Sequence, residues 1–146
     1  MRIDPAAEVL YRLRLAELYL MDAENAFKRG DFRTVVASSQ LSAENAAKAV
    51  IAVFRVPSWS HDPSPELREL RHQVPEAVRD LLDELADIAE ELAPEHGRVT
   101  YGEPTRGLTP WDIYDEGDAR CALERARRAL ADARAVLRAL GQEPRP

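Results

Sequence analysis

The stretch that decides the fold is residues 31–57, which read DFRTVVASSQLSAENAAKAVIAVFRVP. Asp31 suits the N-cap of a helix, and Pro57 disfavours helical geometry at Val56, so the sequence predicts one long helix between these signals. Apolar and small residues recur along it at helical spacing, at Phe32, Val35, Val36, Ser39, Ala43, Ala46, Ala47, Val50, Ile51 and Phe54. Small residues dominate the middle of this stripe, so a neighbouring helix can approach it closely.

A second long helix is predicted immediately before this one. Asp4 suits its N-cap and Pro5 its first turn, while Lys28, Arg29 and Gly30 place cations and then a glycine at its end. Apolar residues keep the helical period in between, at Val9, Leu10, Leu13, Ala16, Leu20, Ala23 and Phe27. The two helices, joined around Gly30, predict an αα-hairpin.

The remainder of the chain adds two helical regions and one irregular stretch. A short turn over 66–72 precedes a longer helix over 75–93, and the closing helix runs from Asp112 or Asp115 to Leu140. Between them, residues 94–109 are predicted to be an irregular loop, which in a small domain is usually functional or mobile. The sequence therefore predicts an all-α, up-and-down four-helix bundle, with four to five helices in all. We expect one domain over residues 1–141, followed by a flexible tail over 142–146.

Composition and charge exclude several classes of protein. The 146 residues carry 26 acidic and 20 basic side chains, a net charge of −6, so a protein that coats duplex DNA with its whole surface is excluded. Cys121 is the one cysteine, which excludes a disulfide scaffold and a cysteine-based zinc site, and we expect it in the core. The sequence has no apolar signal core and no run long enough to span a bilayer, so we expect no membrane association and a cytoplasmic location.

Several short motifs follow one another in a characteristic order. The central helix carries Ser42-Ala43-Glu44-Asn45-Ala46-Ala47-Lys48-Ala49-Val50, and the loop after it carries Ser60-His61-Asp62. Leu67-Arg68-Glu69-Leu70 comes next, and Arg98-Val99-Thr100-Tyr101-Gly102-Glu103-Pro104 precedes the Ala-rich closing helix. This order and spacing resemble those of the HEPN domain family over residues 5–140.

The resemblance implies a bundle of four to five helices that is commonly a homodimer. Many family members are encoded beside a minimal nucleotidyltransferase in toxin–antitoxin-like pairs. Several branches are metal-independent ribonucleases with an Arg-x(4–6)-His motif, in which the arginine binds phosphate and the histidine acts in acid–base cleavage at the 2′-OH. Arg55 and His61 match this spacing, but Val56-Pro57 follows the arginine, where those branches usually have a polar residue.

The pair Glu44 and Lys48 is the first candidate site. The two residues are four apart, hence on one face of the helix and in the favourable order for an ion pair. They predict either an ordinary ion pair or part of an inter-helix cleft that binds a nucleotide or a partner.

Arg55 and His61 are the candidate catalytic pair, because an arginine holds phosphate and a histidine transfers protons near neutral pH. The alternative is an arginine favoured by the dipole at a helix C-terminus and a loop histidine bonded to the backbone.

Arg98, Tyr101 and Arg106 are candidates for binding RNA or a nucleotide, since such a cluster can stack a base and clamp a phosphate. Their alternative role is to tie down the loop. Trp59 and Trp111 suit an interface if they are exposed, although a half-buried tryptophan that anchors a loop is commoner.

No metal site and no cofactor is predicted. The spacing of His61, His72 and His96 matches no known metal-binding motif. The first helix has apolar residues beyond its main stripe, at Tyr11, Leu15, Leu18 and Tyr19, which favours a homodimer.

Three hypotheses about function therefore remain open. The first is a nucleotide-, RNA- or partner-binding module paired with a minimal nucleotidyltransferase. The second is a metal-independent endoribonuclease that uses Arg55 and His61. The third is a structural bundle whose polar loops only close the fold.

Overall fold

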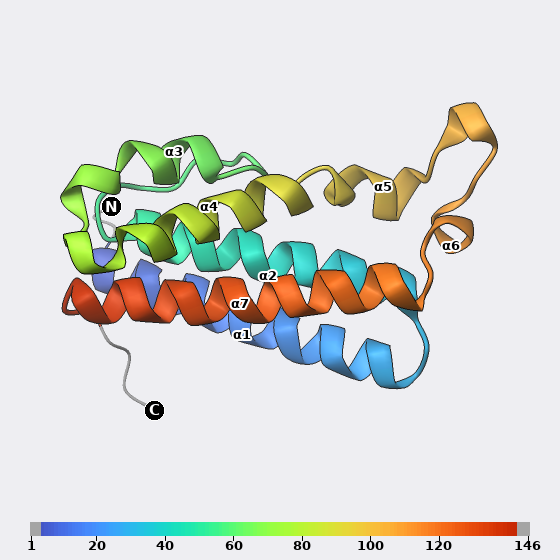
Figure 1. The fold of residues 1–146 in the computed structure, drawn as a ribbon, viewed down its shortest axis with the longest axis horizontal. Coiled ribbons are helices and arrows are strands. Elements are labelled where there is room, and N and C mark those ends of the chain that lie inside the picture. Colours follow the sequence, from blue (N-terminus) through green and yellow to red (C-terminus); the bar gives the residue numbers. More distant parts are fainter. Residues whose placement is uncertain (1–3, 143–146) are drawn as a thin grey trace.

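The computed structural model describes residues 4–142, and every regular element in that range is helical. Its four long helices run alternately up and down (Figure 1): α1 (Pro5–Lys28), α2 (Phe32–Ala52), α4 (Arg79–Leu92) and α7 (Glu116–Ala139). Shorter helices lie in the connections: α3 (Ser64–Glu69), α5 (Glu95–Tyr101) and α6 (Pro110–Ile113). The predicted all-α, up-and-down bundle is confirmed.

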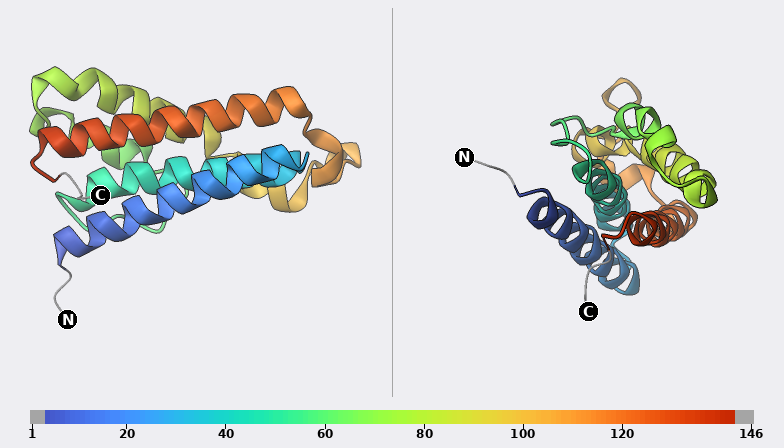
Figure 2. Two further views of the ribbon diagram at one scale, coloured as in Figure 1. Left: turned by 90° about the horizontal axis from the view of Figure 1, so that it is seen from below. Right: turned by 90° about the vertical axis from the view of Figure 1, so that its left-hand side faces the viewer.

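Helix α2 is the centre of the molecule. It contacts all the other α-helices, and the end-on view in Figure 2 places it between α1, α4 and α7. Every residue from 42 to 52 is buried, which explains why this stretch carries five alanines together with Val50 and Ile51. Four polar residues in the same stretch are buried with them, namely Ser42, Glu44, Asn45 and Lys48. Buried polar groups need hydrogen-bond partners, so a functional site is expected at this part of α2.

The helix signals at the αα-hairpin act as predicted. The Asp4 side chain accepts a hydrogen bond from the Ala6 backbone N–H at 3.0 Å, and Asp31 accepts one from that of Thr34 at 3.2 Å. Gly30 has a φ of +73°, a backbone conformation that favours glycine at the end of a helix.

Two parts of the chain differ from the prediction. Helix α4 begins at Arg79, because Glu76–Val78 form a 3₁₀ turn and Val78 leaves helical geometry with φ −118°. Residues predicted to be irregular instead form α5, which Pro94 precedes and Gly102 ends. A Cβ at Gly102 would lie 2.2 Å from the Leu108 carbonyl oxygen, so only glycine fits this close turn. Helix α7 begins after Asp115, which is one of its two predicted starts, and the Asp115 side chain accepts a hydrogen bond from the Asp118 N–H at 2.8 Å.

Three side chains expected inside the molecule or half-buried are exposed. Cys121 lies on the outer face of α7, where it lines a surface pocket together with Arg98 and Arg125, so its expected place in the core is wrong. Trp59 is 96% exposed and Trp111 is 71% exposed, so neither is the half-buried anchor that is commoner for a loop tryptophan. Within residues 4–142, no helix is long and apolar enough to cross a membrane. The predicted tail lies outside the described residues, apart from Gln142.

Candidate functional site

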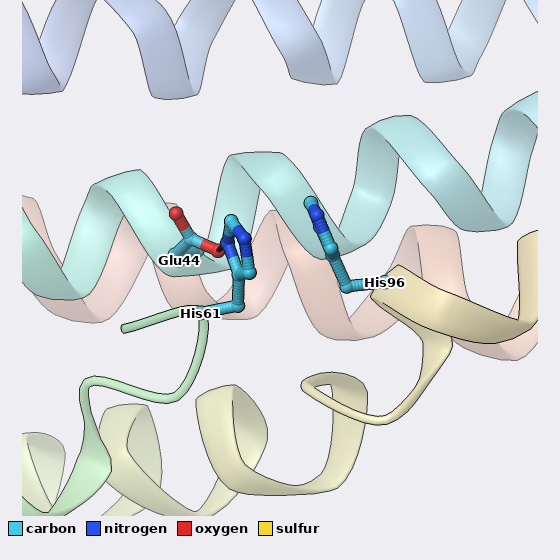
Figure 3. Close-up of side chains that lie close together, drawn as sticks. All are labelled: Glu44, His61 and His96. Carbon is cyan, nitrogen blue, oxygen red and sulfur yellow. Dashed lines mark hydrogen bonds and ion pairs between the residues drawn. The ribbon is translucent and has the colours of Figure 1, made fainter. Parts of the chain in front are cut away.

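The buried carboxylate of Glu44 is the centre of the most unusual polar cluster in the bundle. It lies on α2 with only 5% of its surface exposed. Its Oε1 atom accepts a hydrogen bond from Gln40 Nε2 at 3.1 Å, and its Oε2 atom lies 3.3 Å from Lys48 Nζ. His61 Nδ1 donates to Oε1 as well, at 3.0 Å (Figure 3). The carboxylate is thus held from three directions, which is what a buried charge requires.

Two histidines from distant parts of the chain stack beside this carboxylate. Residues 53–63 leave the end of α2 and turn back along it, which brings His61 next to Glu44, and α5 brings in His96. The two imidazole rings lie 3.5 Å apart between centroids, with 18° between their planes. His96 Nδ1 lies 3.1 Å from Gln40 Oε1. Because both acceptors are oxygens, each ring carries its proton on Nδ1 when neutral and has a lone pair on Nε2.

The electrostatic environment of the cluster favours the neutral form of His96. Burial lowers the pKa of His96 below its usual value, and the neighbouring charge of His61 lowers this pKa further. His61 is 53% exposed and Lys48 only 4% exposed, so the lysine neutralises Glu44 and does not reach solvent. The cluster therefore presents imidazole groups to the outside, and its lysine is not free to bind phosphate.

Arg55 and His61 are not brought together. The Arg55 guanidinium binds Glu69 at 2.9 Å, whereas His61 binds Glu44. From Glu44 to the end of α2 at Ala52 the helix rises by about 12 Å, and Arg55 follows beyond that end. The five intervening residues run back along the helix, so the two side chains bind different carboxylates in spite of their short sequence spacing.

The second predicted cluster is tied down by its own carboxylates. Arg98 bridges Glu95 and Glu103, the latter at 2.7 Å, and Arg106 binds Glu103 at 2.6 Å. Hydrogen bonds from the two arginines lower the pKa of Glu103. Tyr101 in contrast is 75% exposed. The arginines therefore fit the alternative in which they close the loop, and only the tyrosine ring is open to a ligand.

Sequence reasoning missed Gln40 and His96 as partners in the site. Gln40, Glu44 and Lys48 are spaced four residues apart, and this polar line on an otherwise apolar helix was a signal that could have found Gln40. His96 gave no such signal, because only the folded chain places α5 against α2.

Two exposed rings lie close to the histidine pair along the chain. Trp59 lies two residues before His61, and Tyr101 ends the helix that carries His96. We call Trp59, His61, His96 and Tyr101 the aromatic surface. Rings of this kind, in contact with solvent, are the groups on which single-stranded bases stack.

Comparisons with known proteins agree with this fold. The model of the HEPN domain family matches residues 9–144. The crystal structure of TT1696 from Thermus thermophilus is similar, with a TM-score of 0.71 and 22% sequence identity, covering 88% of this chain and 98% of that chain. A search of curated proteins finds no significant match.

Proposed function

Because the chain belongs to the HEPN domain family, we propose that it is a binding module for single-stranded RNA or a nucleotide, with bases stacked on the aromatic surface. The observation that carries this proposal is the exposure of Trp59, which is 96% exposed on the same 53–63 connection that brings His61 to Glu44. An exposed tryptophan leaves a large apolar ring in contact with water, which is unfavourable unless a ligand covers the ring. Base stacking is such a cover, and it tolerates any base.

Stacking, and not phosphate contact, should dominate the affinity. The candidate cations Arg55, Arg98 and Arg106 are each held by a carboxylate, and the protein has a net charge of −6. Few counterions are then released when the ligand binds, so we expect a shallow dependence of affinity on salt concentration.

Replacing Trp59 by alanine is expected to weaken binding of a short single-stranded RNA by roughly 5- to 150-fold, the cost of about 1–3 kcal/mol for one stacked base. The measurement is fluorescence anisotropy with a labelled oligonucleotide. Trp111→Ala is the matched control, since Trp111 is also exposed but lies on α6, where the Arg33 guanidinium covers its ring at 5.1 Å. Equal affinity of Trp59→Ala and the wild type would remove the proposal.

A metal-independent endoribonuclease is the second candidate function. The observation in its favour is the hydrogen bond from His61 to the buried Glu44, because a carboxylate that orients an imidazole is a common arrangement in acid–base catalysis. The residues first proposed for this activity are Arg55 and His61, and Arg55 would have to release Glu69 to bind phosphate. RNA cleavage that persists in chelator and disappears in His61→Ala would favour this candidate over simple binding.

A homodimer through α1 is the proposed assembly. The outer face of α1 exposes Leu10 (51%), Tyr11 (59%), Leu18 (43%) and Met21 (58%) within one arc of the helix. We expect the wild type to sediment as a dimer and Met21→Glu as a monomer, because a charge placed within an apolar contact is costly. Since Met21 is exposed, the substitution should not change the melting temperature of the monomeric bundle. A wild type that sediments as a monomer at all concentrations would contradict the assembly.

The family resemblance also suggests a minimal nucleotidyltransferase as a protein partner. The exposed Trp59, Tyr101 and Trp111 support this, since aromatic residues are enriched in protein interfaces. Co-purification of the two proteins is the corresponding test.

A further inference from the structure

We propose that Glu44, His61 and His96 bind a single divalent transition-metal ion, with Zn²⁺ as the ion that fits best. The three residues come from α2, from the 53–63 connection and from α5, and Figure 3 shows them facing one another. One potential ligand atom from each lies within 4.8 Å of the other two. Spacing along the sequence predicted no metal site, because it could not show that the fold brings two of the three histidines together.

The distances leave room for an ion after a small movement. Two ligands of a tetrahedral zinc ion, each about 2.1 Å from it, lie about 3.4 Å apart. Glu44 Oε1 and His61 Nδ1 are 3.0 Å apart, so an ion can replace the proton of their hydrogen bond with a shift of about 0.4 Å. The remaining separations do not exceed 4.8 Å and must shorten by at most about 1.4 Å.

The surroundings allow this movement and support the ligands. The rings are stacked, so their lone pairs converge only if one ring tilts, and His61 can tilt because it lies on a connection and is 53% exposed. Gln40 already holds His96 through Nδ1, the kind of outer contact that orients a metal-bound histidine. Lys48 occupies Oε2 of Glu44 and leaves Oε1 facing the imidazoles.

The ligand types decide which ion is expected. Two imidazoles and one carboxylate suit zinc and other late first-row ions, whereas Mg²⁺ and Ca²⁺ prefer oxygen ligands alone. Three protein ligands leave a fourth position of the tetrahedron for a water molecule or another ligand, as in zinc sites that are not purely structural. This proposal does not depend on RNA binding, because its readout is the metal itself.

The experiment is a titration of the chelator-treated 146-residue protein with Zn²⁺ by calorimetry and with Co²⁺ by visible absorption. We expect one equivalent of either ion to bind, and the Co²⁺ spectrum to have the intense bands of tetrahedral coordination. His61→Ala and His96→Ala should each bind at least about tenfold more weakly, and Mg²⁺ should not compete. His72→Ala is the matched control, because His72 is the third histidine and lies outside the cluster.

The outcomes separate clearly. Stoichiometric binding that both cluster variants lose and His72→Ala keeps supports the site. Absence of stoichiometric binding, or equal binding by the wild type and His61→Ala, overturns it. Because His61 is half exposed, His61→Ala tests the site even if His96→Ala proves unstable, and far-UV circular dichroism checks the folding of each variant.

Discussion

Glu44→Met should lower the free energy of unfolding by about 3–5 kcal/mol, because it leaves the Lys48 ammonium buried without its partner. The Glu44 and Lys48 side chains are 7% and 4% exposed, so water cannot replace the lost interaction. The substitution also removes the acceptor of the hydrogen bonds from Gln40 and His61. Urea unfolding followed by circular dichroism measures the change.

A double-mutant cycle distinguishes the loss of the ion pair from a simple loss of packing. The double variant Glu44→Met with Lys48→Met replaces both charges by apolar groups of similar size, and we expect it to recover most of the loss. If the double variant is as unstable as the sum of the single variants, the two charges are not coupled. If Glu44→Met costs less than about 1 kcal/mol, the pair is effectively solvated in spite of its burial.

The fold was largely predictable because its signals are local. The Asp4 and Asp31 caps, the glycine at position 30 and the apolar period of α2 each act within a few residues, and each appears in the structure where expected. Helix α5 was missed because Gly97 and the glycines and prolines around it are typical of loops. Contact with α2 and the turn at Gly102 hold the segment in place, and a local pattern does not contain that information.

The candidate site was predictable only in part, for a related reason. Glu44 and Lys48 could be paired from their spacing, since one helix positions both. His61 is a candidate from the sequence and lies in the cluster, but the sequence offers Arg55 or the backbone as its partner, and not Glu44. The backward path of residues 53–63 decides the pairing, and it depends on tertiary packing that spacing does not encode.

A second buried carboxyl group makes stability depend on pH. Asp132 lies on α7 with 2% of its surface exposed, and it faces Glu84 of α4, which Arg128 contacts at 3.2 Å. Burial, together with a hydrogen bond to Glu84, raises the pKa of Asp132 to about 8. The folded protein therefore binds a proton that the unfolded chain, with an ordinary aspartate, releases near pH 4.

The consequence is that Asp132→Asn should stabilise the protein by about 1–4 kcal/mol at pH 8 and above. The stabilisation of the folded state that the raised pKa of Asp132 provides is fully present below pH 4 and is lost as the pH rises toward 8. The wild type should therefore lose stability over this range. The asparagine amide donates to Glu84 without a proton to lose, so the variant should be less sensitive to pH. Urea unfolding of both proteins between pH 4 and 9 measures the difference.

Glu124→Gln is the control for Asp132→Asn, since it also removes a carboxylate from α7 but at an exposed position. It should change stability by no more than about 0.5 kcal/mol at any pH, because substitutions at solvated surface positions have small effects. If the wild type and Asp132→Asn lose stability in parallel as the pH rises, the proton is bound elsewhere. If they diverge and Glu124→Gln follows the wild type, the contact between α4 and α7 holds a neutral carboxyl group at physiological pH, and its ionisation limits the stability of the bundle in alkali.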